Sequence, residues 1–335
     1  MSARLHPLAE RVSAWVARLP ARRRGVVVAV SGGPDSMALL DVLRLLPGVK
    51  IVAAHLDHRL RRGASGADRR LVERVCARIG VELVSGTATD VERAAMLGSG
   101  MENRARQARY GFLEAVRKSK RMHWIATAHH LEDQVETFFL HLFRGAGLAG
   151  LGGMEPIEPG RRLFRPILGA PKQEILDYVA RGGLACRHDA TNLDLARSRN
   201  RVRWQLLPAI RDNFGEPAVP AIARAMELLR GAEAALEQWM DRESSGVIEP
   251  LPGRGRAVGL ALGPLLALPL ALRRLAARRA LSRVAGRGHE GTLAQVEAVL
   301  ELAQRSLPGK RLELGGVVVL RERTRLLVRP ARRQQ

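Results

Sequence analysis

The chain contains 335 residues, and its 46% hydrophobic and 26% charged content is typical of a globular protein with two or three domains. Such a composition excludes a disordered chain, a collagen-like repeat and a disulfide-stapled miniprotein. The formal net charge of +22 favours a polyanionic partner, with nucleic acid first.

The first half of the chain alternates between helical and strand patterns. An amphipathic helix is predicted within the first 24 residues, although its arginines could also mimic a transit peptide. Continuous apolar runs predict strands at 26–30, 51–56, 81–84 and 123–128, and the stretches between and after them predict helices at 36–46, 67–79, 102–117 and 132–143. This alternation predicts a parallel sheet covered on both faces, with a nucleotide site at the carboxyl ends of its strands.

The second half of the chain has a different pattern. A glycine-rich loop is predicted at 145–153 and a linker at 249–255, helices at 171–181, 200–213, 217–240, 270–283 and 292–306, and a terminal hairpin from 311–319 and 324–328. We therefore expect an α/β catalytic domain over residues 1–214, a helical connector over 215–250 and a small C-terminal α+β domain over 251–330 that binds RNA.

The sharpest local feature is the segment Ser31-Gly32-Gly33-Pro34-Asp35-Ser36, which follows an apolar strand and opens a helix. Its glycines allow close backbone approach to a ligand, and the exposed N–H groups of the helix start attract anions. Asp35 would repel a phosphate unless a cation lay between them, so it is a candidate Mg²⁺ ligand. The alternative is an ordinary strand–turn–helix connection.

This segment resembles the pyrophosphate-binding loop of the N-type ATP pyrophosphatase (PP-loop) family, whose members cleave ATP to AMP and pyrophosphate. Further segments resemble, in family order, the motifs of its tRNA(Ile)-lysidine synthetase branch: 54–61, Glu102 with 105–106 and 109–110, 126–137, 144–148, 165–168, 189–194, 199–203 and 206–208. Together these motifs cover about residues 25–210, and as a series they are far more specific than any one of them.

The resemblance implies a Rossmann-like PP-loop domain followed by a mainly helical region and a small α+β domain. It also implies that ATP with Mg²⁺ adenylates O2 of the wobble cytidine of CAU-anticodon tRNA(Ile), and that free L-lysine then attacks C2. The product, lysidine, pairs with A, so the tRNA reads AUA and accepts isoleucine. The ATP-binding residues implied are Ser31, Gly32, Gly33, Pro34, Asp35, Ser36, His55, Asp57 and Arg109, and the catalytic residues are Asp35, His130, Asp133 and Arg203.

The chemistry of His130 and Asp133 fits this interpretation. They are three residues apart, so a helix places them on one face beside the phosphate loop. Asp35 and Asp133 could hold one Mg²⁺ between them, while His130 donates to a phosphate oxygen. The alternatives are a helix-start contact for His130 and a dipole contact for Asp133. Glu132 departs from the aspartate usual in the family.

Arginines supply the remaining candidate contacts. The resemblance implies that Arg203, with its neighbour Arg199, reaches the activated base or ATP, but a solvated basic helix face would give the same pattern. A second group, Arg273, Arg274, Arg278 and Arg279, belongs to a stretch without an acidic residue from 273 to 287 and predicts contacts with the tRNA backbone. A GC-rich genome could explain why only five of 55 basic residues are lysine, but not why acids are so few.

Three rival functions stay open. A tRNA thiolase would usually have paired cysteines, whereas Cys76 and Cys186 form no C-x-x-C pair. A small-molecule ligase of the GMP or NAD synthetase kind would not need a basic C-terminal half. An RNA-binding module with an inactive ATP site is disfavoured because Asp35, His130 and Asp133 are all present. The unpaired cysteines and the absence of a long apolar stretch predict a cytoplasmic protein without a membrane span.

Overall fold

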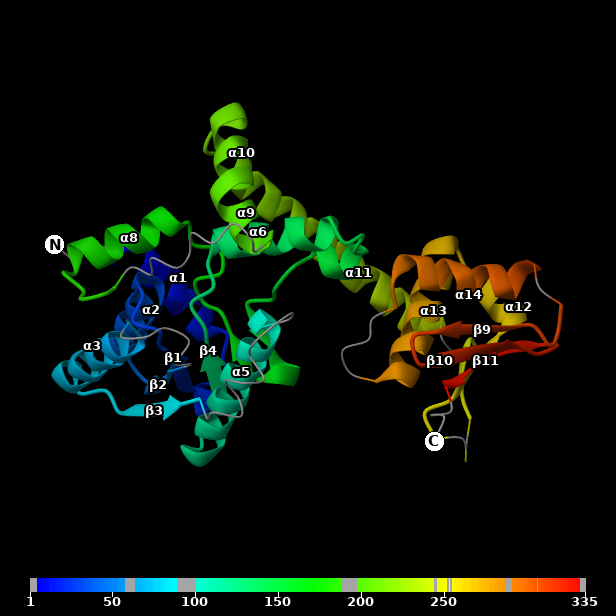
Figure 1. Ribbon diagram of the computed structural model, residues 1–335, viewed down its shortest axis with the longest axis horizontal. Helices are drawn as coiled ribbons and strands as arrows, with labels where there is room; N and C mark the ends of the chain where they lie inside the picture. The colour runs from blue at the N-terminus through cyan, green and yellow to red at the C-terminus, as the bar shows by residue number, and fades with distance from the viewer. Residues whose placement is uncertain are drawn as a thin grey trace. The chain divides into compact units, whose positions relative to one another are not determined.

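The computed structural model describes residues 5–57, 64–88, 101–187, 198–243, 246–251, 253, 255–286, 291–305 and 307–331. The chain forms two compact units (Figure 1). Unit 1 comprises Met1–Thr137 and Met154–Ala223, and unit 2 comprises Phe138–Gly153 and Arg224–Gln335. No helix among the described residues is long and apolar enough to cross a membrane.

Unit 1 is built on a six-stranded sheet in the order β3-β2-β1-β4-β6-β5. The strands are β1 (Gly25–Ala29), β2 (Lys50–Asp57), β3 (Leu83–Thr87), β4 (Trp124–Ala126), β5 (Ile157–Glu158) and β6 (Leu163–Phe164). Their pairings are parallel except at the edge, where β5 runs antiparallel to β6. The predicted parallel sheet is confirmed, and strands β5 and β6, of two residues each, are too short to leave a hydrophobic pattern in the sequence.

Helices cover both faces of this sheet, as the continuous apolar strands predict. Val26 and Val28 face one side, where they pack with α1 (Pro7–Ala17), α2 (Pro34–Leu45), α3 (Ala64–Ile79) and α8 (Lys172–Arg181). Val27 faces the other side and packs with α5 (Met101–Ser119). Because side chains alternate along a strand, every valine of β1 is buried.

The strand order places a switch point beside β1. Strands β1, β2 and β3 follow one another toward one edge, whereas β4 pairs with the other side of β1. The loops that leave β1 and β4 therefore diverge at the same carboxyl edge, which is where open α/β sheets bind ligands. Helices α2 and α6 (Leu131–Leu142) begin directly after these loops.

The predicted single helix over 200–213 is divided. It consists of α9 (Ser198–Arg201), a π-helical turn (Val202–Leu206) and α10 (Leu207–Phe214), and α11 (Ala218–Glu243) follows. The π-helical turn is marked by the Leu207 N–H, which donates to the Val202 carbonyl five residues back. Periodicity cannot locate one extra residue in a helix of this length.

Unit 2 contains an antiparallel sheet in the order β7-β8-β11-β10-β9. Its strands are β7 (Ile248–Pro250), β8 (Val258–Ala261), β9 (Arg311–Leu314), β10 (Val317–Arg321) and β11 (Arg325–Pro330), and its helices after α11 are α12 (Leu262–Ala267), α13 (Leu270–Ala285) and α14 (Leu293–Arg305). One core joins α13 and α14 to the sheet through residues such as Leu272, Val299 and Val319.

Three predicted boundaries in unit 2 are wrong. The strand predicted at 311–319 is two strands, because Gly315 and Gly316 both take positive φ angles and turn the chain. The predicted linker 249–255 begins inside β7, where Pro250 is tolerated on an edge strand. The predicted loop 145–153 contains a short helix, α7 (Leu148–Leu151).

Cys76 on α3 gives the fold a measurable pH dependence. Burial raises the pKa of this thiol from 9.0 to about 11. The unfolded chain therefore loses the proton first, so the stabilisation present below pH 9 is lost as the pH rises toward 11. We expect wild type to lose up to about 1.4 kcal/mol per pH unit relative to Cys76→Ala in urea unfolding. Parallel pH profiles for the two proteins would contradict this.

Candidate functional site

A cavity of about 1010 Å³ opens at the carboxyl edge of the unit 1 sheet. It is lined by the phosphate loop, the start of α6, the start of α8, the π-helical turn with α10, and the start of α11. Of the residues that the sequence predicts for the site, the cavity brings together Ser31, Gly33, Pro34, Asp35, His130, Asp133 and Arg203.

The phosphate loop is held by its two serines. The Ser31 N–H donates to Ser36 Oγ at 3.1 Å, and Ser36 Oγ donates to the Gly33 carbonyl at 3.0 Å. Gly32 has a φ of +89°, a conformation that side chains other than glycine rarely adopt. Gly33 caps α2 without a side-chain hydrogen bond and lines the cavity with Pro34 and Asp35, so the helix start with its N–H groups is a candidate anion site.

Lys172 is a site residue that sequence reasoning missed. It begins α8, and its ammonium contacts the carboxylate of Asp35. Both residues line the cavity, so a cation and an anion stand together beside the phosphate loop. The signal in the sequence that could have pointed to Lys172 is the rarity of lysine, because only five lysines occur among 55 basic residues.

At the start of α6, a helix-capping hydrogen bond occurs together with contacts between His130 and two carboxylates. Asp133 Oδ2 accepts the backbone N–H of His130 at 3.1 Å, which is half of a capping box. The imidazole of His130 is buried, with Nδ1 3.0 Å from Glu132 Oε2 and Nε2 3.5 Å from Asp133 Oδ2. The helix-start contact proposed as an alternative is therefore present together with a charged cluster.

Asp133, Glu136, Arg199 and Arg203 form a compact group, here called the four-charge cluster. Glu136 is 0% exposed. Its two carboxylate oxygens accept hydrogen bonds from Arg199 Nε at 2.7 Å and from Arg203 Nε at 2.5 Å. Asp133 Oδ1 receives Arg203 at 2.9 Å and Arg199 at 3.3 Å. The two arginines thus do not form a solvated basic face, and Glu136 fixes both of them.

These contacts set the protonation states of the site. Burial opposes the charged form of Asp133, but His130 and the two arginines outweigh it and hold the pKa of the carboxyl well below its usual range. Burial also opposes protonation of His130, but Asp133, Glu132 and Asp35 raise its pKa above the ordinary value. Burial lowers the pKa of the neighbouring His129 to about 3, so that ring is neutral. The pKa values of the two adjacent histidines are therefore shifted in opposite directions.

Asp35 fits a magnesium site better than Asp133 does. The described residues contain no group of three or more ligating His, Cys, Asp or Glu side chains. Mg²⁺ usually takes one or two carboxylates together with water and substrate phosphates. Asp35 lines the cavity and contacts Lys172 through Oδ1, whereas both oxygens of Asp133 already accept hydrogen bonds. Asp133 would have to exchange an arginine to bind a metal.

The other predicted ATP contacts lie outside the cavity lining. His55 on β2 is buried, with Nδ1 2.8 Å from the Val30 carbonyl, and its Nε2 has no hydrogen-bond partner among the described residues. Asp57 ends β2, and the Arg109 guanidinium lies 5.7 Å from the Tyr110 ring centroid. Residues 58–61 of the resembling motif 54–61 and the whole of the motif 189–194 lie outside the described residues.

Three of the four predicted tRNA contacts on α13 are ion-paired within unit 2, and the fourth binds a backbone carbonyl. Arg278 contacts Glu233 and Glu237, and Arg279 contacts Glu237 and Asp241, so α11 supplies the acids. Arg274 pairs with Glu297 of α14 at 2.5 Å, and Arg273 Nε donates to the Leu268 carbonyl at 2.6 Å. Part of the positive charge that the sequence assigned to RNA is therefore used to hold helices together.

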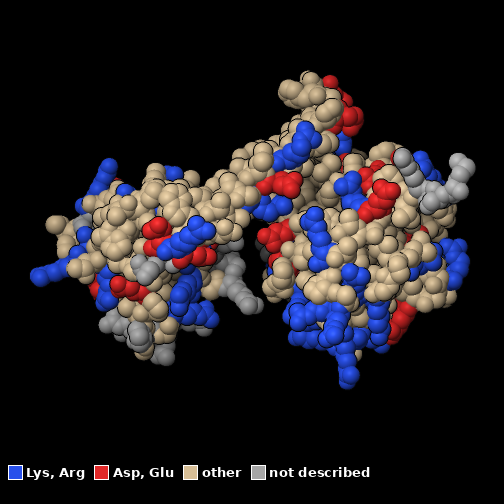
Figure 2. All heavy atoms as spheres, turned by 180° about the vertical axis from the view of Figure 1, so that it is seen from behind, with Lys and Arg blue, Asp and Glu red and all other residues tan. Residues whose placement is uncertain are grey.

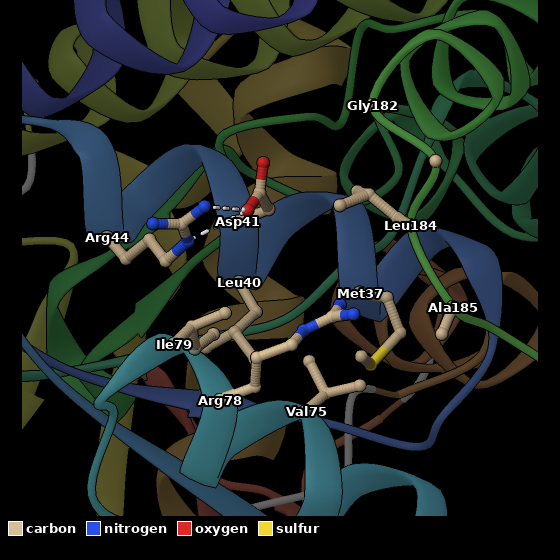
Figure 3. A pocket seen from close by; sticks show the side chains of 11 residues that line it. Met37, Leu40, Asp41, Arg44, Val75, Arg78, Ile79, Gly182, Leu184 and Ala185 are labelled. Atoms are coloured by element: carbon tan, nitrogen blue, oxygen red, sulfur yellow. Dashed lines mark hydrogen bonds and ion pairs between the residues drawn. The ribbon is translucent and has the colours of Figure 1, made fainter.

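Unit 1 has a second, smaller cavity of about 250 Å³ between α2, α3 and the segment after α8 (Figure 3). Its single carboxylate, Asp41, already accepts from Arg44 at 2.8 Å and from the Tyr178 hydroxyl at 2.7 Å. The remaining lining is largely aliphatic, including Met37, Leu40 and Ile79. The larger cavity is therefore the candidate active site.

The fold and this cavity define a nucleotide-binding α/β protein of the PP-loop class, and the model of the PP-loop domain family matches residues 5–210. The chain is 36% identical over 282 residues to the tRNA(Ile)-lysidine synthase of Gloeobacter violaceus, and the match covers 82% of each chain. The chain therefore belongs to the tRNA(Ile)-lysidine synthase family, which confirms the resemblance found in the sequence.

Three further comparisons stand beside this result. The tRNA(Ile)-lysidine synthase of Symbiobacterium thermophilum is 39% identical over 319 residues, and the match covers 92% of this chain and 66% of that one. The match to the Geobacter sulfurreducens enzyme covers 61% of that chain, so this chain spans about two thirds or less of these relatives. Among solved structures, the U34-tRNA thiolase NcsA of Methanococcus maripaludis shares the fold, with a TM-score of 0.55 at 17% identity over 67% of this chain and 78% of that one.

Proposed function

We propose that the chain is a cytoplasmic enzyme that joins free L-lysine to C2 of the wobble cytidine of CAU-anticodon tRNA(Ile). The observation that carries this proposal is the cavity at the switch point, in which the phosphate loop, His130 and Asp133 meet within a chain of the lysidine synthase family. The basic composition supports an RNA substrate, since Lys and Arg outnumber Asp and Glu over the face drawn in Figure 2.

ATP is proposed to bind with its phosphates against the loop from Ser31 to Ser36. The N–H groups at the start of α2 and the Lys172 ammonium would donate hydrogen bonds to the phosphate oxygens. Asp35 would hold Mg²⁺, which neutralises charge on the pyrophosphate when it is bound. His55, Asp57 and Arg109 stay predicted contacts of ATP, and Asp133 stays a predicted second metal ligand.

Two bond exchanges make up the proposed reaction. Cytosine O2 attacks the α-phosphorus, and the bond to the β-phosphate oxygen breaks, so that pyrophosphate leaves with the electron pair. The neutral ε-amine of lysine then attacks C2, and AMP departs with O2. His130, whose pKa is raised, can donate a hydrogen bond to a phosphate oxygen as charge develops. Arg203 is held by Asp133 and Glu136 and lines the same cavity, where it can face the activated base.

The α13 arginines Arg273, Arg274, Arg278 and Arg279 are proposed, with Arg199, as RNA contacts. Phosphates would have to share or displace acidic partners such as Glu237 and Glu297. Their contribution to affinity should therefore be smaller than their number suggests, and it should weaken with salt.

The experiment that tests this function is incorporation of labelled lysine into purified CAU tRNA(Ile) with ATP and Mg²⁺. We expect incorporation into this tRNA, none into elongator tRNA(Met), and loss with Asp35→Asn. Pyrophosphate release that needs a small acid but no RNA would instead place the chain with the small-molecule ligases.

A further inference from the structure

Trp204 is an aromatic side chain in the wall of the active-site cavity. It lies in the π-helical turn, and four apolar residues of α10 and α11 line the cavity with it: Leu207, Pro208, Val219 and Pro220. We propose that this wall is a nucleobase subsite, in which the pyrimidine to be modified leaves the RNA stack and lies flat against the indole ring of Trp204. This inference rests on the proposed function and adds the residue that receives the base.

The exposure of Trp204 distinguishes it from a core residue. Its side chain is 46% exposed, whereas Leu207 and Val219 in the same wall are each 1% exposed. Only 4% of the chain is aromatic, and Trp204 is one of four tryptophans. Large apolar side chains are usually buried, so a half-exposed tryptophan in the wall of a cavity is informative. Its flat ring suits a planar ligand.

The turn that carries Trp204 is anchored by its neighbours. The preceding residue, Arg203, makes three hydrogen bonds to Asp133 and Glu136. On the other side of that arginine, Val202 is buried and its carbonyl closes the π-helical turn by accepting from Leu207. Trp204 therefore projects from an anchored turn rather than from a free loop, and π-helical turns occur frequently at functional sites.

The surroundings of Trp204 favour a base over a polyphosphate. The phosphate loop and Lys172 belong to α2 and α8, whereas the Trp204 wall comes from the π-helical turn, α10 and α11. The nearby cations in this wall are already paired, Arg203 with the four-charge cluster and Arg211 with Glu132. A volume of about 1010 Å³ is at the upper end for ligand pockets, so ATP and a second planar group have room.

The test uses an anticodon stem-loop RNA with fluorescent pyrrolocytosine at the wobble position. We expect the bound base to be quenched in wild type, where it stacks on the indole, and to be brighter in Trp204→Ala, where it has left the RNA stack and meets no ring. The KM for tRNA should rise about 5- to 150-fold, the range of base–aromatic stacking, with the KM for ATP within about twofold of wild type. Trp204→Phe should keep most of both signals.

The matched control is Trp239→Ala, since Trp239 on α11 is 45% exposed but does not line this cavity. It should quench and react like wild type. Unchanged quenching in Trp204→Ala, or a raised KM for ATP with tRNA unaffected, would overturn the subsite, the latter by assigning Trp204 to adenine. Quenching without lysine transfer would reject only the proposed function, and lysine transfer without quenching would reject only the subsite.

Discussion

Glu136→Ala is expected to lower the free energy of unfolding by about 3–5 kcal/mol, the cost of removing one partner from a buried ion pair. Glu136 is 0% exposed and accepts from both Arg199 and Arg203. Without it, Asp133 alone would face two guanidinium groups that are largely removed from water. The arginines would have to remain partly unpaired or turn out of the site.

Urea unfolding followed by fluorescence measures this effect. The matched control is Glu297→Ala, because Glu297 also pairs with an arginine, Arg274, but their side chains are 44% and 45% exposed. That substitution should cost at most about 1 kcal/mol. If both variants lost the same free energy of unfolding, the four-charge cluster would stabilise the fold no more than an exposed ion pair does.

Asp35→Asn is expected to reduce pyrophosphate release by about 10³-fold or more. A metal that neutralises the leaving phosphates supplies several kcal/mol, and each 1.4 kcal/mol corresponds to about tenfold in rate. The variant keeps the size of the side chain but removes the charge that would hold Mg²⁺. Its contact with Lys172 also weakens, so the ammonium is freer to meet a phosphate and ATP binding should fall less than turnover.

Asp41→Asn is the matched control, because Asp41 lies on the same helix but pairs with Arg44 and Tyr178 at the smaller cavity. Titrating Mg²⁺ in the pyrophosphate assay, and measuring Mn²⁺ binding in the presence of ATP, should show a shift for Asp35→Asn alone. If the metal dependence of Asp35→Asn were the same as that of wild type, Asp35 would not be the metal ligand, and Mg²⁺ would be held by Asp133 or by the nucleotide itself.

The sequence predicted the parts of the fold that have a strong local pattern. The apolar run of β1 and the glycines after it located both the central strand and the phosphate loop, because burial on two faces and an anion-binding turn each leave a compact signature. It missed β5 and β6, each of two residues, and the extra residue of the π-helical turn. Such features depend on tertiary pairing rather than on periodicity.

The sequence predicted those residues of the site that lie in recognisable sequence motifs. Asp35, His130, Asp133 and Arg203 line one cavity, as their positions after strands and on helix faces suggested. Lys172 was missed because it meets Asp35 from 137 positions away. The same limitation affected α13, whose arginines find acids on α11 and α14 that a window along the sequence does not include. Charge pairing across helices is a property of the folded chain.

The π-helical turn makes the number of residues in this segment matter as well as their identity. Deleting one residue between Val202 and Leu206 would restore regular α-helical bonding, but each residue rotates a helix by about 100°. Arg203 would then keep its register with Glu136 only if Leu207 and the rest of α10 turned away from the cavity. An insertion or deletion in this turn would therefore displace Arg203 or the α10 wall of the cavity even if every side chain were kept.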